Sequence, residues 1–510
     1  MEIGRLLREI DVLEIKGSFN SELDIQNIQY DSRKITSQGL FVAIKGHICD
    51  GHKYLANARD NGAVAVIVQE FVDDEILQIK VKDSRIALAN FSAAFYDYPS
   101  DELFSIGITA TNGKTTTSYM TKAIFDAYEI SSGIVGTVAV NYGEVSIPSI
   151  LTTPESRDLQ MHFRNMIDSG ITDVIMEVSS HALELSRVRN VHFDIITFSN
   201  LSKEHIDQHG CFEKYRMIKS KLITEASAES IALLNYDDEY IRSLADQTQA
   251  QVISYSIAKP VAFDFGIDQI DLSTGYAQFN FMINRDFPEF NLVKGCHRIQ
   301  LGMAGYSSVM NAMVAIIISL LRGIPMTVIS QALAEFGGVE RRFQVVYDQE
   351  VKIIDDHYAN VNNINVTMET IERMDFNQFK MLYAIRGNRG VNLNRECAQE
   401  TAKWFKKLGQ ATIYSTSSIE TVTAKDKVLA EEKAVFDQVM SENDIHVIHH
   451  DRLDEAIEHI LTQLEAEDLL LLAGCQGMDP GARILLEKKT ESLPEEERQQ
   501  ILKVLKGRAF

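Results

Sequence analysis

The chain has 510 residues and a formal net charge of -22, with 45% hydrophobic and 24% charged residues. This composition is ordinary for a folded protein rather than a disordered one, and the negative charge argues against nonspecific binding to nucleic acids or anionic membranes. Because the length exceeds what one hydrophobic core supports, we expect about three domains.

The N-terminal segment and the cysteines predict a cytoplasmic protein. The segment MEIGRLLREIDVLEI interleaves charged and apolar residues, unlike a secretory signal, and no stretch of the sequence reaches transmembrane length. The five cysteines are scattered and form no Cys-x-x-Cys pair, so they predict neither a zinc ribbon nor a disulfide framework. We therefore expect a reducing compartment and no membrane or nucleic-acid partner.

The first predicted domain, residues 1–102, is a small α/β unit. The apolar runs GLFVAIKG and GAVAVIVQE are typical of strands, and HKYLANARDNG between them is typical of a helix.

The second predicted domain, residues 103–338, begins with a strand, a turn and a helix. Alternating apolar residues from Phe104 predict a half-buried strand. Met120, Ile124 and Tyr128 recur every four residues, which predicts one face of a helix.

The turn between strand and helix, TATNGKTTT, carries Lys114 and several hydroxyls. Backbone N–H groups at a helix start bind anions, and a lysine followed by hydroxyls suits a phosphate with Mg²⁺. The turn therefore predicts a nucleotide-phosphate loop, although a strict Walker loop has Gly where this chain has Ile108. The alternative is an ordinary turn whose lysine points into water.

Three further apolar runs, DVIMEVSS, DIITFSN and SIALLN, end in polar residues, as buried parallel strands do. Ligands gather at the carboxyl ends of such strands, where Glu177, Asn200 and Asn235 lie. Mg²⁺ prefers oxygen ligands, so we expect Thr115 and Glu177 to share the metal. The alternative is that Glu177 only caps the following turn.

A polar region follows, with His205, Asp207, His209 and Lys219 close together in sequence. The histidines could be zinc ligands, but no third soft ligand stands at the usual spacing, so ordinary polar roles fit at least as well. On its local pattern alone, Lys219 is interpreted as a solvated helix residue.

The third predicted domain, residues 339–510, restarts the alternation. The runs VKIIDD, FKMLYAIRG, ATIYSTSS, IHVIHH and DLLLLAGCQG are separated by helical stretches such as LDEAIEHILTQLE, which predicts a second doubly wound sheet. The tail ESLPEEERQQILKVLKGRAF predicts a surface helix.

Several motifs together resemble a known family. ITATNGKTTT, LTTPESRDLQ, MEVSSHALELSR, FSNLSKEHIDQHG, EKYRMIKSKL and LLNYDD, in this order and spacing, resemble the Mur ligases of peptidoglycan assembly, most of all the MurE type that adds the third residue of the stem peptide. The resemblance implies an α/β fold of three domains: a UDP-substrate domain, a central P-loop NTPase-like parallel sheet that binds ATP, and a C-terminal Rossmann-like doubly wound sheet for an amino acid.

The resemblance also implies an activity. ATP and Mg²⁺ convert a carboxylate of a UDP-N-acetylmuramoyl-dipeptide into an acyl phosphate, which the amine of an amino acid attacks to form an amide. The implied catalytic residues are Lys114, Glu177, His205 and Lys219, and the implied metal ligands are Thr115, Glu177, His205 and Lys219, the last as a carbamate.

The same resemblance assigns the binding residues. ATP is assigned to Thr111, Asn112, Gly113, Lys114, Thr115, Thr116, Asn235, Asn311, Arg342 and Asp356. The UDP-linked muramoyl peptide is assigned to Ser32, Arg33, Thr152, Thr153, Ser179 and Arg187, and the amino acid to Arg389.

Departures from the family leave the amino acid open. Diaminopimelate-adding enzymes carry DNPR where this chain has STSSIE, so an arginine that would clamp a distal carboxylate is absent. Ala110 also stands where the family has Gly. Two alternatives remain: a MurE-like ligase of a specialised pathway with another acceptor, and a catalytically silent binding protein of the same fold. The intact Lys114, Thr115 and Glu177 argue against the silent protein.

Overall fold

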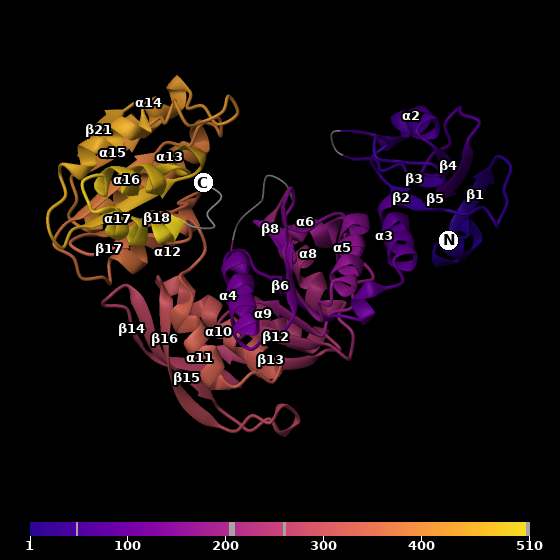
Figure 1. The fold of residues 1–510 in the computed structure, drawn as a ribbon, viewed down its shortest axis with the longest axis horizontal. Coiled ribbons are helices and arrows are strands. Elements are labelled where there is room, and N and C mark those ends of the chain that lie inside the picture. The colour runs from indigo at the N-terminus through magenta and orange to yellow at the C-terminus, as the bar shows by residue number, and fades with distance from the viewer. Residues whose placement is uncertain (47–48, 203–209, 259–261, 506–510) are drawn as a thin grey trace. The chain divides into compact units, whose positions relative to one another are not determined.

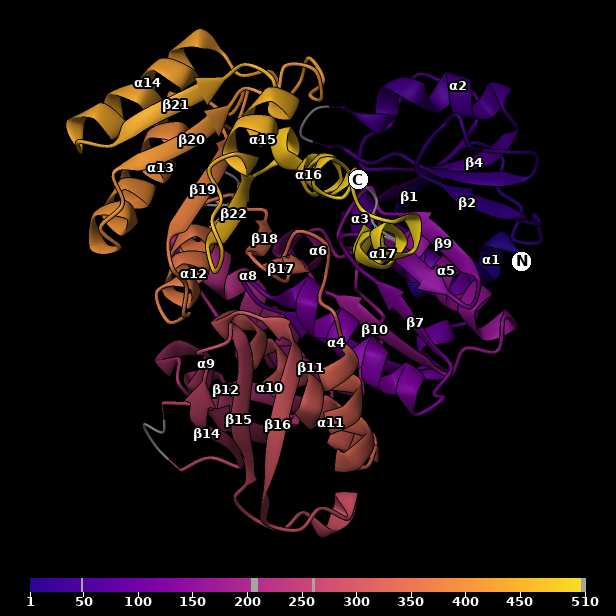
Figure 2. The same ribbon diagram turned by 60° about the vertical axis from the view of Figure 1, so that its left-hand side comes forward.

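The structure is a computed structural model that describes residues 1–46, 49–202, 210–258 and 262–505 (Figures 1 and 2). These residues form two compact units. The first comprises Met1–Gly266, Met282–Gly295 and Val314–Val328, and the second Ile267–Phe281, Cys296–Met313 and the described chain from Ile329 onward. None of the described helices combines the length and apolar composition that a membrane crossing needs.

The first sheet has five strands in the order β1-β5-β4-β3-β2, with β1 antiparallel and the others parallel. Its elements are α1 (Ile3–Leu6), β1 (Val12–Lys16), β2 (Asn27–Gln29), β3 (Gly39–Val42), α2 (Leu55–Asp60), β4 (Ala63–Val68), β5 (Leu77–Val81) and α3 (Ser84–Phe95). Both faces are covered, since Leu40 and Val42 join one apolar cluster and Phe41 another. The two predicted strands are β3 and β4, and the helix predicted between them is α2 with the short turn before it.

The second sheet has eleven strands in the order β16-β15-β14-β13-β12-β11-β6-β10-β7-β8-β9. The strands are β6 (Phe104–Thr109), β7 (Ser132–Val135), β8 (Ala139–Tyr142), β9 (Val145–Pro148), β10 (Asp173–Glu177), β11 (Ile195–Phe198), β12 (Ile231–Asn235), β13 (Gln251–Ser256), β14 (Phe265–Asp271), β15 (Tyr276–Ile283) and β16 (Gly295–Ala304). In this spatial order, all neighbouring strands from β14 across to β7 are parallel. Strands β8 and β9, which follow β7 at the edge, are antiparallel to their neighbours.

The helices between and after these strands in the chain are α4 (Lys114–Ala127), α5 (Ser156–Asp168), α6 (Ser180–Glu184), α8 (Phe212–Thr224), α9 (Glu239–Ser243), α10 (Tyr306–Leu321) and α11 (Met326–Glu335). Helix α4 follows β6 directly, as predicted, and Met120 and Ile124 on it are fully buried. Tyr128, the third residue of the predicted face, follows the last residue of the helix and is 44% exposed.

The third sheet has six strands in the order β17-β18-β22-β19-β20-β21, with only β17 antiparallel to its neighbour. The strands are β17 (Gln344–Asp348), β18 (Lys352–Asp356), β19 (Phe379–Ala384), β20 (Thr412–Thr416), β21 (His446–His450) and β22 (Leu469–Gly474). The helices are α12 (Val361–Ile371), α13 (Val391–Lys407), α14 (Ala430–Glu442), α15 (Leu453–Leu461), α16 (Gly481–Lys489) and α17 (Glu495–Leu502).

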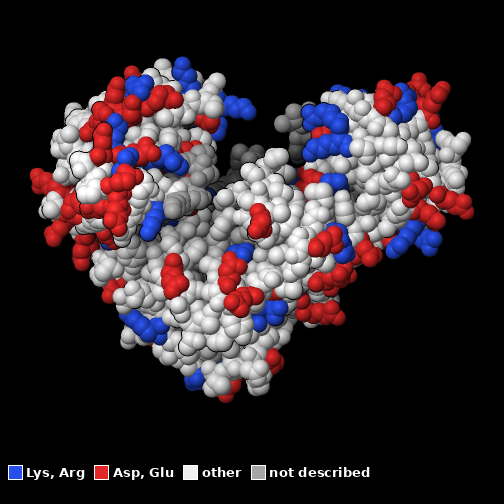
Figure 3. All heavy atoms as spheres, in the orientation of Figure 1, with Lys and Arg blue, Asp and Glu red and all other residues white. Residues whose placement is uncertain are grey.

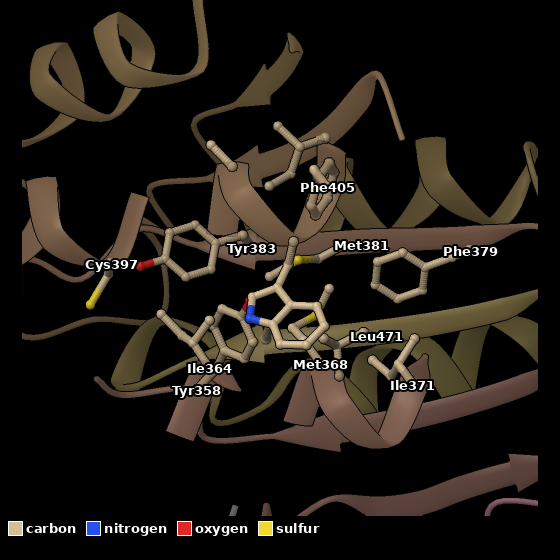
Figure 4. Packing of buried hydrophobic residues seen from close by; sticks show 14 of the residues in the cluster. Tyr358, Ile364, Met368, Ile371, Phe379, Met381, Tyr383, Cys397, Phe405 and Leu471 are labelled. Atoms are coloured by element: carbon tan, nitrogen blue, oxygen red, sulfur yellow. The ribbon is translucent and has the colours of Figure 1, made fainter. Parts of the chain in front are cut away.

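This sheet is doubly wound, as predicted. Met381 and Leu471 point into a cluster with residues of α12, α13 and α14, including Met368 and Phe405 (Figure 4). Leu382 and Leu472 point to the opposite face, against α15 and α16. The predicted surface helix is α17, none of whose residues is buried. The fold class is therefore α/β with three mainly parallel sheets, while the domain boundaries after residues 102 and 338 stay predictions.

Candidate functional site

The predicted phosphate loop joins β6 to α4. Gly113 immediately precedes α4 and has a φ of 91°, a left-handed conformation that glycine adopts without the steric cost of a side chain. Asn200, two residues after the end of β11, fixes the loop. Its Oδ1 accepts the N–H of Asn112 at 3.0 Å, and its Nδ2 donates to the carbonyl of Asn112 at 2.8 Å. The N–H groups at the start of α4 are thereby held at the carboxyl edge of the sheet, where an anion can bind them.

The structure brings Thr115 and Glu177 together. Glu177 ends β10 beside β6, opposite Ile108, and its side chain is fully buried. The Thr115 hydroxyl donates to Glu177 Oε2 at 2.9 Å. A buried carboxylate therefore lies against the first turn of the phosphate-loop helix.

Thr137 is a site residue that the sequence did not reveal. Its N–H donates to Glu177 Oε1 at 2.8 Å and its hydroxyl to Glu177 Oε2 at 3.0 Å. A side chain at the preceding Gly136 would collide with the same carboxylate. The sequence does show a Gly-Thr-Val stretch after β7. This stretch could be recognised as part of the site only by knowing that β7 lies next to β10 in the sheet.

Lys114 and Lys219 both contact the loop. Lys114 Nζ donates to the carbonyl oxygens of Ala110 at 2.9 Å and Thr111 at 3.1 Å. Lys219 Nζ donates to the same Ala110 oxygen at 2.7 Å and to Thr109 Oγ1 at 3.1 Å, and only 1% of Lys219 is exposed. The interpretation of Lys219 as a solvated helix residue is therefore wrong, because α8 places it beneath the loop.

The other loop and strand-end residues predicted for ATP are buried in the first unit. Thr111 is buried, and its Oγ1 lies 3.2 Å from the Tyr215 hydroxyl. Thr116 is buried in the first turn of α4. Asn235 at the end of β12 donates from Nδ2 to the carbonyl of Ser199 at 2.8 Å.

Three residues predicted for the UDP-linked peptide, Thr152, Thr153 and Ser179, are hydrogen-bonded to Glu177, to Thr137 or to one another. Thr152 Oγ1 is 3.1 Å from Thr137 Oγ1, and Thr153 Oγ1 donates to the Glu177 carbonyl at 2.8 Å. Ser179 N–H donates to Thr153 Oγ1 at 3.1 Å, and the Ser179 hydroxyl caps α6. These bonds join the loop before α5 to the end of β10.

Arg187 lies beside this loop and is buried. Its guanidinium pairs with Glu155, at 3.0 Å from Nε and 2.8 Å from Nη2, and donates to the Thr153 carbonyl at 3.2 Å. The arginine therefore orders the loop that carries Thr153.

Ser32 and Arg33 lie in the loop after β2. Ser32 is buried and its carbonyl accepts a hydrogen bond from Asn61 at 2.9 Å. The Arg33 side chain is 83% exposed and pairs with Asp31 at 2.8 Å.

In the second unit, Asp356 ends β18 and makes only internal bonds among those described. It accepts hydrogen bonds from Phe343 N–H at 2.9 Å, Tyr358 N–H at 3.1 Å and Thr367 Oγ1 at 2.9 Å. Burial raises the pKa of Asp356 above its ordinary value although these bonds oppose the rise. Arg342 is half-buried, and Asn311 is buried in α10.

Arg341, one residue before the predicted Arg342, has a left-handed backbone conformation with a φ of 57°. Its guanidinium is buried and pairs with Asp355 at 3.3 Å and with Asp479. It also donates to the carbonyl of Cys475 at 2.9 Å. Sequence reasoning missed this arginine because its partners lie on β18 and after β22.

His357 follows β18 in the same region. Burial and the nearby guanidinium groups of Arg342, Arg341 and Arg386 lower the pKa of His357 to about 3. The ring is therefore neutral at physiological pH.

Arg389, predicted for the amino acid, lies in the loop between β19 and α13. Its side chain is 37% exposed and its Nη2 donates to Asp426 at 3.0 Å. The backbone around it is bonded by Glu432, a residue that the sequence did not single out.

His205, with Asp207 and His209, lies outside the described residues. Within the described chain, no three His, Cys, Asp or Glu side chains gather in a way that could hold a metal ion. Of the four predicted metal ligands, Thr115 and Glu177 are in contact, and Lys219 lies under the same loop.

Comparison with known proteins identifies the family. The Mur ligase middle domain matches residues 108–319, the Mur ligase family catalytic domain matches residues 24–96, and the Mur ligase glutamate ligase domain matches residues 341–476. A UDP-N-acetylmuramoyl-L-alanyl-D-glutamate--2,6-diaminopimelate ligase of Alkaliphilus metalliredigens is 32% identical over 481 residues, which cover 93% of this chain and 92% of that protein. The enzyme of the same name from Listeria monocytogenes is 31% identical over 485 residues, covering 93% of each.

Solved structures agree on the fold. A structure of a UDP-N-acetylmuramoyl-L-alanyl-D-glutamate--2,6-diaminopimelate ligase superposes with a TM-score of 0.69 at 22% identity, covering 93% of each chain. The MurF ligase from Thermotoga maritima, solved in complex with ADP, superposes with a TM-score of 0.62 at 18% identity, covering 92% of this chain and 98% of that one. This chain therefore belongs to the Mur ligase family.

Proposed function

We propose that the protein is an ATP-dependent ligase that joins an amino acid to UDP-N-acetylmuramoyl-dipeptide in peptidoglycan precursor synthesis. The observation that carries the proposal is the hydrogen bond of 2.9 Å between Thr115, in the first turn of α4, and the strand-end carboxylate of Glu177. A hydroxyl and a carboxylate at the start of a helix suit a nucleotide phosphate and its metal ion. The relatives described above are named as ligases of UDP-N-acetylmuramoyl-L-alanyl-D-glutamate.

The proposed reaction follows from what the loop can stabilise. The substrate acid takes the terminal phosphoryl group of ATP, and the resulting acyl phosphate releases phosphate when the amine forms the amide. Negative charge spreads over the phosphoryl oxygens during the first step. The N–H groups at the start of α4 and the Lys114 ammonium would stabilise this charge, with Asn112 held in place by Asn200.

The residues around Glu177 fit a magnesium ion. Thr115 and Glu177 offer the hydroxyl and carboxylate oxygens that Mg²⁺ prefers, and by the resemblance His205 contributes as well. When bound, Mg²⁺ would offset the charge of the phosphate oxygens. Thr137 would hold the Glu177 carboxylate in orientation through its two hydrogen bonds.

We propose that Lys219 acts as a carbamate. A carbamylated nitrogen keeps one N–H, which is enough to retain the hydrogen bond of 2.7 Å to the Ala110 carbonyl. The two added oxygens would convert a buried cation into an anionic ligand beside the loop. A buried ammonium beside a metal ion is electrostatically unfavourable, whereas a carbamate at the same place would attract the ion.

The remaining binding roles follow the resemblance. Thr152, Thr153, Ser179 and Arg187 would hold the linked peptide, Ser32 and Arg33 the uridine side, and Asn235, Asn311, Arg342 and Asp356 the ATP. Arg187 would act on the substrate while Glu155 shares its guanidinium. We further propose a cytoplasmic location, with small molecules as the only substrates and no nucleic-acid or membrane partner.

One observation favours a second candidate, a MurE-like ligase of a specialised pathway. The relatives are named for 2,6-diaminopimelate, yet the loop after β20 lacks the arginine that would clamp a distal carboxylate. The Ser415 hydroxyl lies 2.9 Å from Nδ1 of His449, and the Ser417 hydroxyl lies 3.2 Å from Nε2 of the same ring. Burial lowers the pKa of His449 below its ordinary value, so this cluster offers no positive charge to a distal carboxylate, which favours a nucleophile other than diaminopimelate.

The test is phosphate release from ATP in the presence of UDP-N-acetylmuramoyl-dipeptide and a panel of amino acids, with mass spectrometry of the product. We expect one amino acid to give a new amide. Lys114→Ala should abolish product formation, because the loop loses its ammonium group.

Lys122→Ala is the matched control. Lys122 lies on the same helix and pairs with Asp126 at the surface, so the variant should keep the wild-type rate. Ligation with no amino acid in the panel would remove the proposed function, and a wild-type rate in Lys114→Ala would remove the proposed site.

A further inference from the structure

The loop between β19 and α13 presents three consecutive backbone N–H groups, those of Asn388, Arg389 and Gly390, here called the nest. Asn388 has a φ of 54° and Gly390 a φ of 88°, and Gly390 is the residue immediately before the 17-residue helix α13. N–H groups arranged in this way at a helix start bind negative charge. In a domain predicted to bind an amino acid, such a nest would attract the carboxylate of a substrate.

The chain fills the nest with its own carboxylate. Glu432 Oε1 accepts the N–H groups of Arg389 and Gly390, both at 2.8 Å. Its Oε2 accepts the N–H of Asn388 at 2.8 Å and that of Leu429, just before α14, at 2.9 Å. The Glu432 side chain is fully buried. Each of its oxygens accepts two hydrogen bonds, which compensate the carboxylate for the loss of water.

Neighbouring contacts hold the same loop against the segment before α14. Arg389 Nη2 donates to Asp426 at 3.0 Å, and Asn388 Nδ2 donates to the Lys425 carbonyl at 3.1 Å. A side chain at Gly387 would collide with the backbone of Asp426. The nest, Arg389 and the segment before α14 therefore form one locked arrangement.

We propose that Glu432 is a positioning residue of the amino-acid site: it fills the nest with an internal carboxylate, closes the start of α13 to substrate anions, and fixes the loop that presents Arg389. This proposal rests on the proposed function, because Arg389 is the residue assigned to the amino acid. With the nest closed, the substrate carboxylate has to be recognised by the side chain of Arg389 and not by the backbone.

The chemistry of the four donors makes Glu432→Gln a sharp test. A carboxamide oxygen can accept two of the four N–H groups, but the amide nitrogen carries hydrogens and would face the other two donors. The variant keeps the size of the side chain and loses only its charge and two acceptor positions. Glu431→Gln is the matched control, because Glu431 is its exposed neighbour in the first turn of α14.

Two readouts are taken on the full-length protein. Amide hydrogen exchange should be slow at residues 388–390 in the wild type and in Glu431→Gln, and on the order of tenfold faster or more in Glu432→Gln. The KM for the amino acid should rise on the order of tenfold in Glu432→Gln, with the KM for ATP unchanged, because only the presentation of Arg389 is disturbed.

The outcomes separate the claims. Faster exchange without a change in the KM for the amino acid would overturn the positioning role and leave the proposed function intact. Unchanged exchange would show that Glu432 does not hold the nest. If the wild type ligates no amino acid, the proposed function fails, while the exchange measurement still decides whether Glu432 fills the nest.

A second variant covers the case in which Glu432→Gln folds poorly. Glu432→Ala should leave a space that added acetate fills, restoring slow exchange at residues 388–390 and the wild-type KM. Acetamide has the same shape without the charge and should restore neither. Equal rescue by both compounds would overturn the role of the carboxylate charge.

Discussion

Glu177 and Glu432 are both fully buried carboxylates bonded by donors from distant segments. Their partners differ in a way that separates their roles. Glu177 is bonded by one backbone N–H and by two threonine hydroxyls, whose oxygens can also bind a cation. Glu432 is bonded by four backbone N–H groups, which are donors and cannot bind a cation themselves. Both carboxylates are buried, so the type of hydrogen-bond donor separates Glu177, the candidate metal ligand, from Glu432, which positions a loop.

Electrostatics gives a second contrast at this scale. Burial opposes the ionisation of Glu432, but the four N–H donors outweigh it and lower the pKa of Glu432 below its ordinary value. His357 has the opposite surroundings, since burial and three nearby guanidinium groups all oppose its protonation.

We predict a pH dependence of stability that originates from His357. The unfolded chain takes up a proton at this ring near its ordinary pKa of 6.5, whereas the folded protein does so only at about 3. The contribution of His357 to the free energy of unfolding is therefore complete above the ordinary pKa and is lost progressively as the pH falls from 6.5 to about 3.

Urea unfolding at about pH 7 and about pH 5.5 measures this loss. The wild type should lose about 1 kcal/mol more than His357→Asn over this interval, because the variant has no ring to protonate. Parallel pH profiles for the two proteins would contradict the prediction.

At the scale of elements, the connection after α10 is tied to the start of β10. Arg322 donates from Nε to Asp173 at 2.7 Å and packs on the Phe104 ring at 4.7 Å, and the Asp173 side chain is fully buried. The pair therefore joins a helix end to two adjacent parallel strands, β10 and β6.

Arg322→Ala should lower the free energy of unfolding by about 3 kcal/mol, because it leaves a buried carboxylate without its cation. The same measurement on Arg298→Ala, which removes an exposed arginine, should give a small change. Adding Asp173→Asn to Arg322→Ala should recover part of the loss. An unchanged stability in Arg322→Ala would show that the ion pair does not anchor these strands.

The elements also show what the sequence could and could not predict. Local patterns were sufficient for β6, α4 and the parallel strands, because apolar periodicity and polar strand ends are local properties. The pairing of Thr115 with Glu177 followed from the rule that ligands gather at strand ends. Thr137 was missed because it lies 40 positions from Glu177 and is brought near only by the order of the strands.

Predicting the second unit from its sequence was harder for the same reason. Glu432 bonds a loop that is 42 to 44 positions away, and Arg341 pairs with Asp479 across 138 positions. The local pattern of Lys219 indicated a solvated residue, and only the resemblance associated it with the phosphate loop. Long-range contacts of this kind leave no periodic signal.

At the scale of the whole molecule, the net charge is a sum over all 510 residues and can be read from the sequence alone. The formal net charge is -22 at pH 7. On the face drawn in Figure 3, Lys and Arg side chains are interspersed with Asp and Glu. A chain with this charge repels polyanions at long range.

We therefore predict that the full-length protein does not bind duplex DNA at physiological salt. Fluorescence anisotropy of a short labelled duplex should stay constant on titration with the protein, because each bound phosphate would need a basic partner. A lysine-rich protein serves as the positive control. Saturable binding that weakens with added salt would contradict the prediction and reveal a local basic site.

The ion pairs of Arg341 have a consequence for how this protein can diverge from its relatives. Arg341 holds a left-handed backbone conformation and pairs with two carboxylates, Asp355 and Asp479. Replacement of Arg341 by glycine would relax the backbone but leave both acids without their cation. Loss of either acid alone would leave the guanidinium with one carboxylate instead of two. Single mutational steps away from this arrangement are thus each disfavoured, so we expect the three positions to be inherited and exchanged as one block.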